Sequence, residues 1–110
     1  MDEVRMLRHV VYETAGKYHL AHGEFFTCLG QSDKTSITLA AIKARKAGGH
    51  YRVALQKLVN QLILSGQMAS HREEVQRAQQ TLDNLEREMN ALAAYRQEEA
   101  HNRVVAGQPE

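Results

Sequence analysis

The sequence predicts an all-α protein, and three observations lead to that class. Apolar residues recur at steps of three and four along most of the chain, which is the spacing of amphipathic helices rather than of strands. The single proline, Pro109, stands at the very end, so the strongest helix breaker is missing from the rest. Glycine-containing turns separate the periodic segments. We therefore expect two long helices, packed antiparallel or as a bundle, with a short helical hairpin in between.

The clearest helix is expected over residues 71–102. Ser70 and Glu73 have the spacing of a capping box, in which each side chain satisfies a free backbone N–H group at the helix start. Apolar residues then follow at the heptad spacing of coiled coils, until Arg96 and Glu99 make the series polar. The apolar members are Val75, Ala78, Leu82, Leu85, Met89 and Leu92. This helix is therefore expected to be coiled-coil-like.

Three further helices are expected, over residues 2–29, 34–47 and 50–65. The first carries a stripe from Val4 to Cys28 that passes Gly16 and Gly23, and each glycine costs a helix about 1 kcal/mol relative to alanine. A break at these glycines stays an open alternative. Glycines 48 and 49 are expected to separate the two short helices, and residues 65–67 to form the turn into the last helix. Residues 1–103 would form a single helical domain, and residues 104–110 a flexible tail.

The composition excludes several classes of protein. Cys28 is the only cysteine, which suits a reducing compartment, and neither a secretory signal nor a membrane-spanning apolar run is recognisable. A cytoplasmic protein without membrane contact is the expectation. The sequence contains no glycine-rich phosphate loop and no nucleophile motif. We therefore expect no catalytic residues, no cofactor, no small-molecule substrate and no enzymatic activity.

His19, His22 and Cys28 raise the question of a metal site. Histidines three apart on a helix can share a zinc ion, and cysteine is a suitable third ligand. On a continuous helix, however, Cys28 lies six residues beyond His22, which is about 240° around the axis. Because only two ligands converge, we expect no metal site.

The positive charge of the chain is concentrated in its middle third. Residues 32–70 contain six lysines and arginines against one acid, whereas residues 71–110 contain five against eight. With Gly48 and Gly49 between two helices, this segment resembles a helix-turn-helix, which implies nucleic-acid binding through the second helix. The residues assigned to that interface are Lys43, Arg45, Lys46, His50, Arg52, Gln56 and Lys57. Two other roles for these basic residues stay open. Cations near a helix C-terminus stabilise that helix, and the same cations could bind the acidic last helix.

Helix lengths provide the second functional argument. The last expected helix is about twice as long as the short helix before it, so part of its apolar stripe needs another cover. That stripe is the expected interface with a protein partner or a second copy, with the residues Leu82, Leu85, Met89, Leu92 and Tyr95. The leading hypothesis is thus a small non-enzymatic interaction protein, such as an adaptor, a chaperone-like protein or an assembly subunit. The alternative is a nucleic-acid-binding regulator or a subunit of a nucleoprotein complex.

Overall fold

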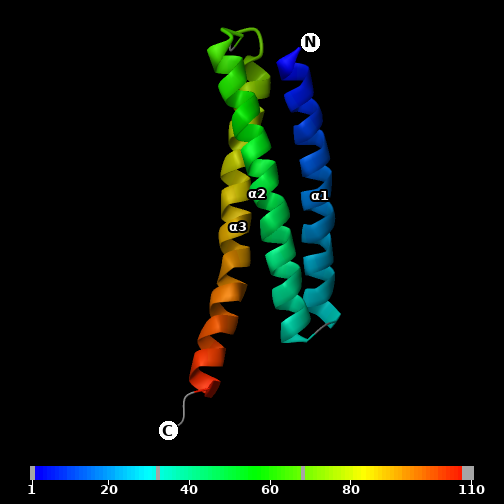
Figure 1. Cartoon of the computed structure of the whole chain (residues 1–110), viewed down its shortest axis with the longest axis vertical. Helices are drawn as coiled ribbons and strands as arrows, with labels where there is room; N and C mark the ends of the chain where they lie inside the picture. Colours follow the sequence, from blue (N-terminus) through cyan, green and yellow to red (C-terminus); the bar gives the residue numbers. More distant parts are fainter. Residues whose placement is uncertain (1, 32, 68, 108–110) are drawn as a thin grey trace.

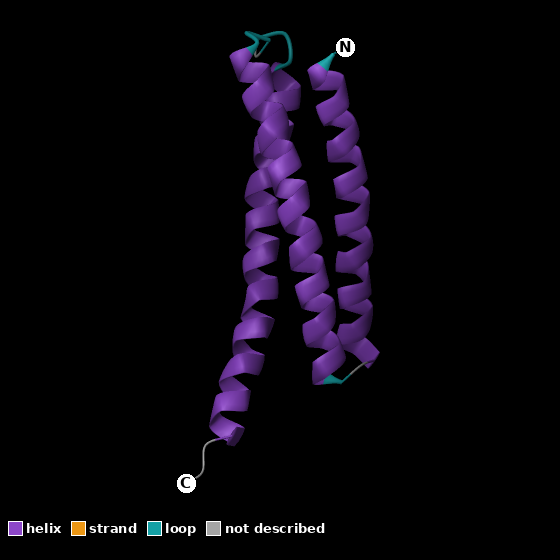
Figure 2. Ribbon diagram, in the orientation of Figure 1, coloured by secondary structure: helices purple, strands orange, loops and turns teal. Residues whose placement is uncertain are grey.

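The computed structural model describes the backbone of residues 2–31, 33–67 and 69–107, and the side chains of residues 2–30, 33–67 and 69–95. This part of the chain forms three long helices, α1 (Glu3–Gln31), α2 (Lys34–Leu64) and α3 (Arg72–Gly107), and contains no strand (Figure 1). Within the described residues, loops occur at the helix connections and at the start of the chain (Figure 2). The molecule is elongated, with extents of 62 × 26 × 22 Å. The all-α class is confirmed.

The expected short hairpin is wrong, because α2 continues through Gly48 and Gly49 without a turn. Ala44 and Tyr51, on either side of the glycines, belong to the same buried face of the helix. That face packs against both α1 and α3, and packing outweighs the cost of glycine in a helix. The same holds for α1, which is continuous through Gly16 and Gly23.

Gly48 is a place of close approach rather than a break. A Cβ atom added here would lie 3.1 Å from Cε1 of Tyr18 on α1 and 3.1 Å from Sδ of Met89 on α3. A Cβ atom added to the neighbouring Gly49 would meet nothing within 4 Å. At Gly48 the three helices therefore meet over bare backbone.

The two helix connections follow from local chemistry. Asp33 caps α2, since its carboxylate accepts a hydrogen bond of 2.8 Å from the backbone N–H of Ser36, and this bond holds the pKa of Asp33 below its usual range. The predicted turn after α2 is confirmed at Gly66, whose φ of 73° favours glycine. The capping box before α3 does not form as expected: residues 69–71 form a turn, in which the Ser70 hydroxyl donates to the Gln67 carbonyl.

The backbone of α3 remains helical to Gly107, past the expected end at residue 102. Residues 104–107, assigned to a flexible tail, thus belong to this helix, and residues 108–110 of that tail lie outside the described residues. In Figure 1, α3 extends beyond the connection between α1 and α2.

Large side chains connect α1 to α3, which run in the same direction on either side of α2 (Figure 1). Arg8 donates two hydrogen bonds to the Glu74 carboxylate, at 2.8 and 2.7 Å. The Tyr18 hydroxyl donates to Oε1 of Glu88 at 2.6 Å. Further along, the rings of Phe25 and Tyr95 meet edge to face, 5.1 Å apart. These contacts fix the register of α1 against α3.

The core consists of two neighbouring clusters of buried side chains. The larger includes Tyr18 of α1, Leu62 of α2 and Val75 of α3, each exposed by 1% or less. The smaller gathers Ala21, Phe25, Ala41, Ala44 and Leu92. Burial and the nearby Glu88 carboxylate raise the pKa of both Tyr18 and Tyr51, so both phenols stay protonated at neutral pH.

Gly48 and Gly49 offer a matched test of this packing. Gly49→Ala is expected to raise the free energy of unfolding by about 1 kcal/mol, because alanine favours the helix and meets no neighbour. Gly48→Leu is expected to lower it by about 1–3 kcal/mol or more, because the new side chain displaces Tyr18 and Met89. Urea unfolding followed by circular dichroism measures both. Equal stabilisation by Gly49→Ala and Gly48→Leu would show that the contact at Gly48 is loose.

The Arg8–Glu74 pair predicts a dependence of stability on pH. The hydrogen bonds from Arg8 lower the pKa of Glu74, so the pair stabilises the fold above the unfolded-state pKa and is lost as pH falls through the lower folded value. Since both side chains are partly exposed, at 40% and 29%, Glu74→Gln should cost only about 0.5–1 kcal/mol at about pH 7. Once the pH is below the lowered folded-state pKa of Glu74, the two proteins should be equally stable.

Glu73→Gln is the control for this experiment. The Glu73 side chain is 90% exposed and 3.9 Å from Arg77, so its removal should change the urea midpoint less than Glu74→Gln at every pH. Identical pH profiles for the two variants would contradict the assignment.

Candidate partner-binding groove

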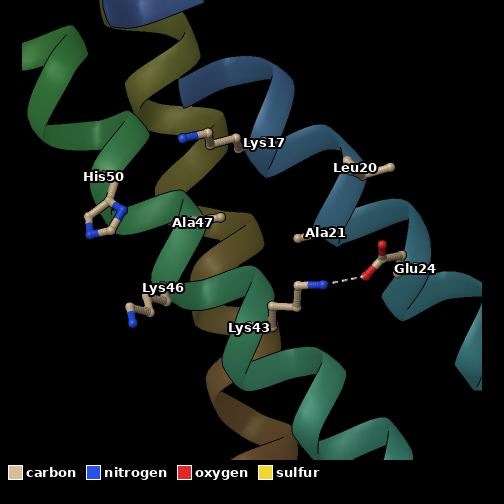
Figure 3. A pocket seen from close by; sticks show the side chains of 8 residues that line it. All are labelled: Lys17, Leu20, Ala21, Glu24, Lys43, Lys46, Ala47 and His50. Carbon is tan, nitrogen blue, oxygen red and sulfur yellow. Dashed lines mark hydrogen bonds and ion pairs between the residues drawn. The ribbon is translucent and has the colours of Figure 1, made fainter. Parts of the chain in front are cut away.

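A shallow groove runs between α1 and α2 on the surface. It encloses about 270 Å³. Figure 3 shows its lining side chains, four from each helix: Lys17, Leu20, Ala21, Glu24, Lys43, Lys46, Ala47 and His50. Residues three, four and seven apart share one face of a helix, so each helix contributes about two turns to one wall.

The floor of the groove is apolar and its edges are charged. The small side chains of Ala21 and Ala47 leave space between the helices, and Leu20 extends into solvent with 67% of its surface exposed. The Lys43 ammonium pairs with the Glu24 carboxylate at 3.0 Å across the groove (Figure 3). Both side chains are largely exposed, so this ion pair is weak and open to exchange with a ligand.

Charge in the groove is unbalanced. Three lysines and a histidine line it together with a single acid, Glu24. Lysine has a long apolar stem and a charged tip, so it can cover an apolar ligand surface and still reach an anionic group. The groove therefore offers apolar contact at its centre and positive charge at its edges.

The residues assigned to nucleic-acid binding lie on two different sides of α2. Lys43, Lys46 and His50 line the groove with α1. Arg52 and Gln56 instead line a second groove with α3, where Asp83 and Glu86 lie opposite. The helix-turn-helix resemblance is wrong for this segment, because a single helix replaces the two expected ones.

The other two residues of that set also lie apart from the groove. Arg45 is half-buried, and its Nε has no hydrogen-bond partner among the described residues. Lys57 is exposed on α2. Nucleic-acid binding stays a prediction. Without a recognition helix, it would depend on the lysines of one helix face.

The residues assigned to a partner interface on α3 belong to the chain's own core. Leu85 is 2% exposed and Leu92 is 1% exposed. Leu82 and Met89 pack half-buried against the larger cluster, and Tyr95 packs against the smaller one. A partner contact at these residues stays a prediction, but the exposed apolar side chains lie elsewhere.

Several large apolar side chains are exposed on the outer side of α2. Leu39 is 61% exposed, Ile42 40%, Val53 49% and Leu64 82%. Together with Lys46 they occupy the side of the helix opposite its buried face, as helix geometry requires. The apolar periodicity of the sequence does not reveal these residues, because lysine and glycine interrupt the row.

His19 and His22 take part in an aromatic group. The ring of His22 stacks on Tyr18, with 5.3 Å between centroids, and meets Phe26 edge to face at 4.8 Å. His19 lies 5.6 Å from Tyr18, and Cys28 is half-buried. Among the described residues, no three histidine, cysteine or acidic side chains are placed to share a metal ion.

Comparison of the chain with protein-family models, with curated proteins and with solved structures gave no match. Within the described residues, no helix is sufficiently long and apolar to cross a membrane.

Proposed function

We propose that this chain is a non-enzymatic interaction protein that binds an acidic, amphipathic helix of a protein partner in the groove between α1 and α2. The observation that carries the proposal is the composition of this groove. An apolar floor of small residues lies between three lysines, with one acid already paired to Lys43.

The shape of the groove favours an elongated ligand. Two antiparallel helices present a linear furrow, and a third helix can place its side chains in such a furrow at the spacing of its turns. The exposed side chains of Leu39 and Val53 lie on the outer side of α2, beside the groove rather than in its lining. Exposed apolar surface of this kind is typical of interaction sites.

The charge of the groove favours an acidic ligand. A helix with glutamates beside its apolar stripe would place carboxylates near Lys17 and Lys46. One of its carboxylates could also replace that of Glu24 as the ion-pair partner of Lys43. Such contacts at an exposed edge determine selectivity and association rate more than affinity. Nucleic acid offers the same negative charge, but its backbone would leave the apolar floor unused, so we place it second.

The experiment uses two synthetic helical peptides with the same leucine and alanine stripe, one flanked by glutamates and the other by lysines. We expect the full-length protein to bind the acidic peptide selectively in fluorescence anisotropy, with an affinity that falls as salt is raised. The double substitution Lys17→Glu and Lys46→Glu should weaken this binding by about tenfold or more and favour the basic peptide.

Lys57→Glu reverses one lysine charge on an exposed site of α2 outside the groove, so its matched counterpart is Lys46→Glu alone, which makes the same charge change inside the groove. Lys57→Glu should weaken binding much less than Lys46→Glu. Equal losses would indicate attraction to overall charge, and would reject the groove. Tighter binding to a duplex DNA oligonucleotide than to the acidic peptide, lost in the double variant, would instead support the nucleic-acid alternative.

A further inference from the structure

Aromatic rings and glycines alternate along the exposed face of α1. Steps of four and three residues place one row on this face, in the order Tyr12, Gly16, His19, Gly23, Phe26 and Gly30. All six residues are exposed, with Tyr12 at 79% and Phe26 at 58%. We call this row the aromatic–glycine face.

The packing of the chain itself does not explain these glycines. A Cβ atom added to Gly16, Gly23 or Gly30 would meet no atom within 4 Å, in contrast to Gly48. Each glycine also weakens α1 as a helix, relative to alanine. Three such residues at intervals of seven on one face provide a row of recesses into which another helix can approach closely.

We propose that a second copy of this chain packs its α1 antiparallel against this face. The row is complementary to itself in one antiparallel register. Tyr12 of each copy lies opposite Gly30 of the other, His19 lies opposite Gly23, and Phe26 lies opposite Gly16. The exposed side chains of Tyr12 and Phe26 then face glycines, and a two-fold axis relates the copies. The His19 ring also packs within its own chain, 5.6 Å from Tyr18 and 6.1 Å from Tyr51.

A parallel pair lacks this complementarity. In a parallel, in-register dimer, identical positions face each other, so rings would meet rings and glycines would meet glycines. The aromatic layers would hold the helices apart and leave voids at the glycine layers. The sequence order therefore specifies the antiparallel arrangement, and self-complementarity specifies a second copy rather than an unrelated helix.

Charge and area agree with a weak homodimer. The six residues of the face include no lysine, arginine or acid. Glu13 and Lys17, which have opposite charges, lie beside the face. An aromatic side chain presents about 150–250 Å², so the exposed parts of Tyr12 and Phe26 in two copies offer roughly 500–600 Å². With His19 and the glycine backbone the total approaches roughly 1,000 Å², the lower limit for specific association.

The first test is sedimentation velocity of the full-length protein at concentrations from about 1 to about 500 µM. We expect a reversible monomer–dimer equilibrium. Gly16→Leu and Gly23→Leu fill the recesses, so each should raise the dimer dissociation constant by about tenfold or more. Each should also raise the urea midpoint of the monomer, because leucine favours a helix more than glycine does.

Gly49→Leu is the matched control, since it makes the same change on α2, away from this face. It should leave dimerisation unchanged. A protein that is monomeric throughout this range, or a dimer that Gly23→Leu leaves intact, would overturn the proposal. Lys46→Glu alone changes a groove residue on α2, outside the aromatic–glycine face of α1, and should leave the dimer intact, so dimerisation and the binding function of the groove can fail independently.

A second test determines the register. Two single-cysteine proteins are prepared with Cys28→Ser, one carrying His19→Cys and the other Gly23→Cys. When they are mixed and oxidised, disulfides between positions 19 and 23 should form faster than those joining two identical positions. A predominance of 19–19 and 23–23 disulfides would indicate parallel helices, and the absence of crosslinks would indicate that α1 does not face α1; either result rejects the proposal.

Discussion

The contact of three helices over Gly48 is the constraint on which the rest of the fold depends. Tyr18 from α1 and Met89 from α3 both reach the bare backbone of α2 at this point. Because no side chain intervenes, α1 and α3 lie close enough for the Tyr18 hydroxyl to reach Glu88. A side chain at position 48 would separate the helices and weaken that hydrogen bond together with the ring contact between Phe25 and Tyr95.

The same glycine explains why the sequence predicted the helices better than their arrangement. Apolar spacing identifies the buried stripes of α1 and α3, since that signal comes from residues of one helix. The turn after α2 was also predictable, because Gly66 serves a local backbone requirement. Gly48 has no such local signal. In the sequence alone, a glycine that breaks a helix cannot be distinguished from a glycine at which a neighbouring helix approaches closely. The distinction requires the side chains that lie opposite the glycine.

The charges of the middle segment show a similar limit. Along the sequence, residues 32–70 form a single basic block. On a continuous helix this block divides, so that Lys43 faces Glu24 of α1 while Arg52 lies beside Asp83 and Glu86 of α3. Part of the excess charge thereby contributes to the attraction between helices. Lys43 and Lys46, by contrast, line the groove between α1 and α2 together with Lys17.

The helix α1 carries two stripes of similar spacing with different consequences. Its inner stripe, from Val4 to Phe25, is rich in large apolar side chains and is covered by α2 and α3. Its outer stripe alternates rings with glycine, and in the folded chain it remains in solvent. A stripe of large apolar side chains can be buried within one chain, because side chains of the neighbouring helices fill the space around it. An alternating stripe fits only a surface with the opposite alternation, and in an antiparallel pair α1 itself supplies that surface. In the proposed dimer, the glycines that weaken α1 as a helix would provide the recesses for the rings of the second copy.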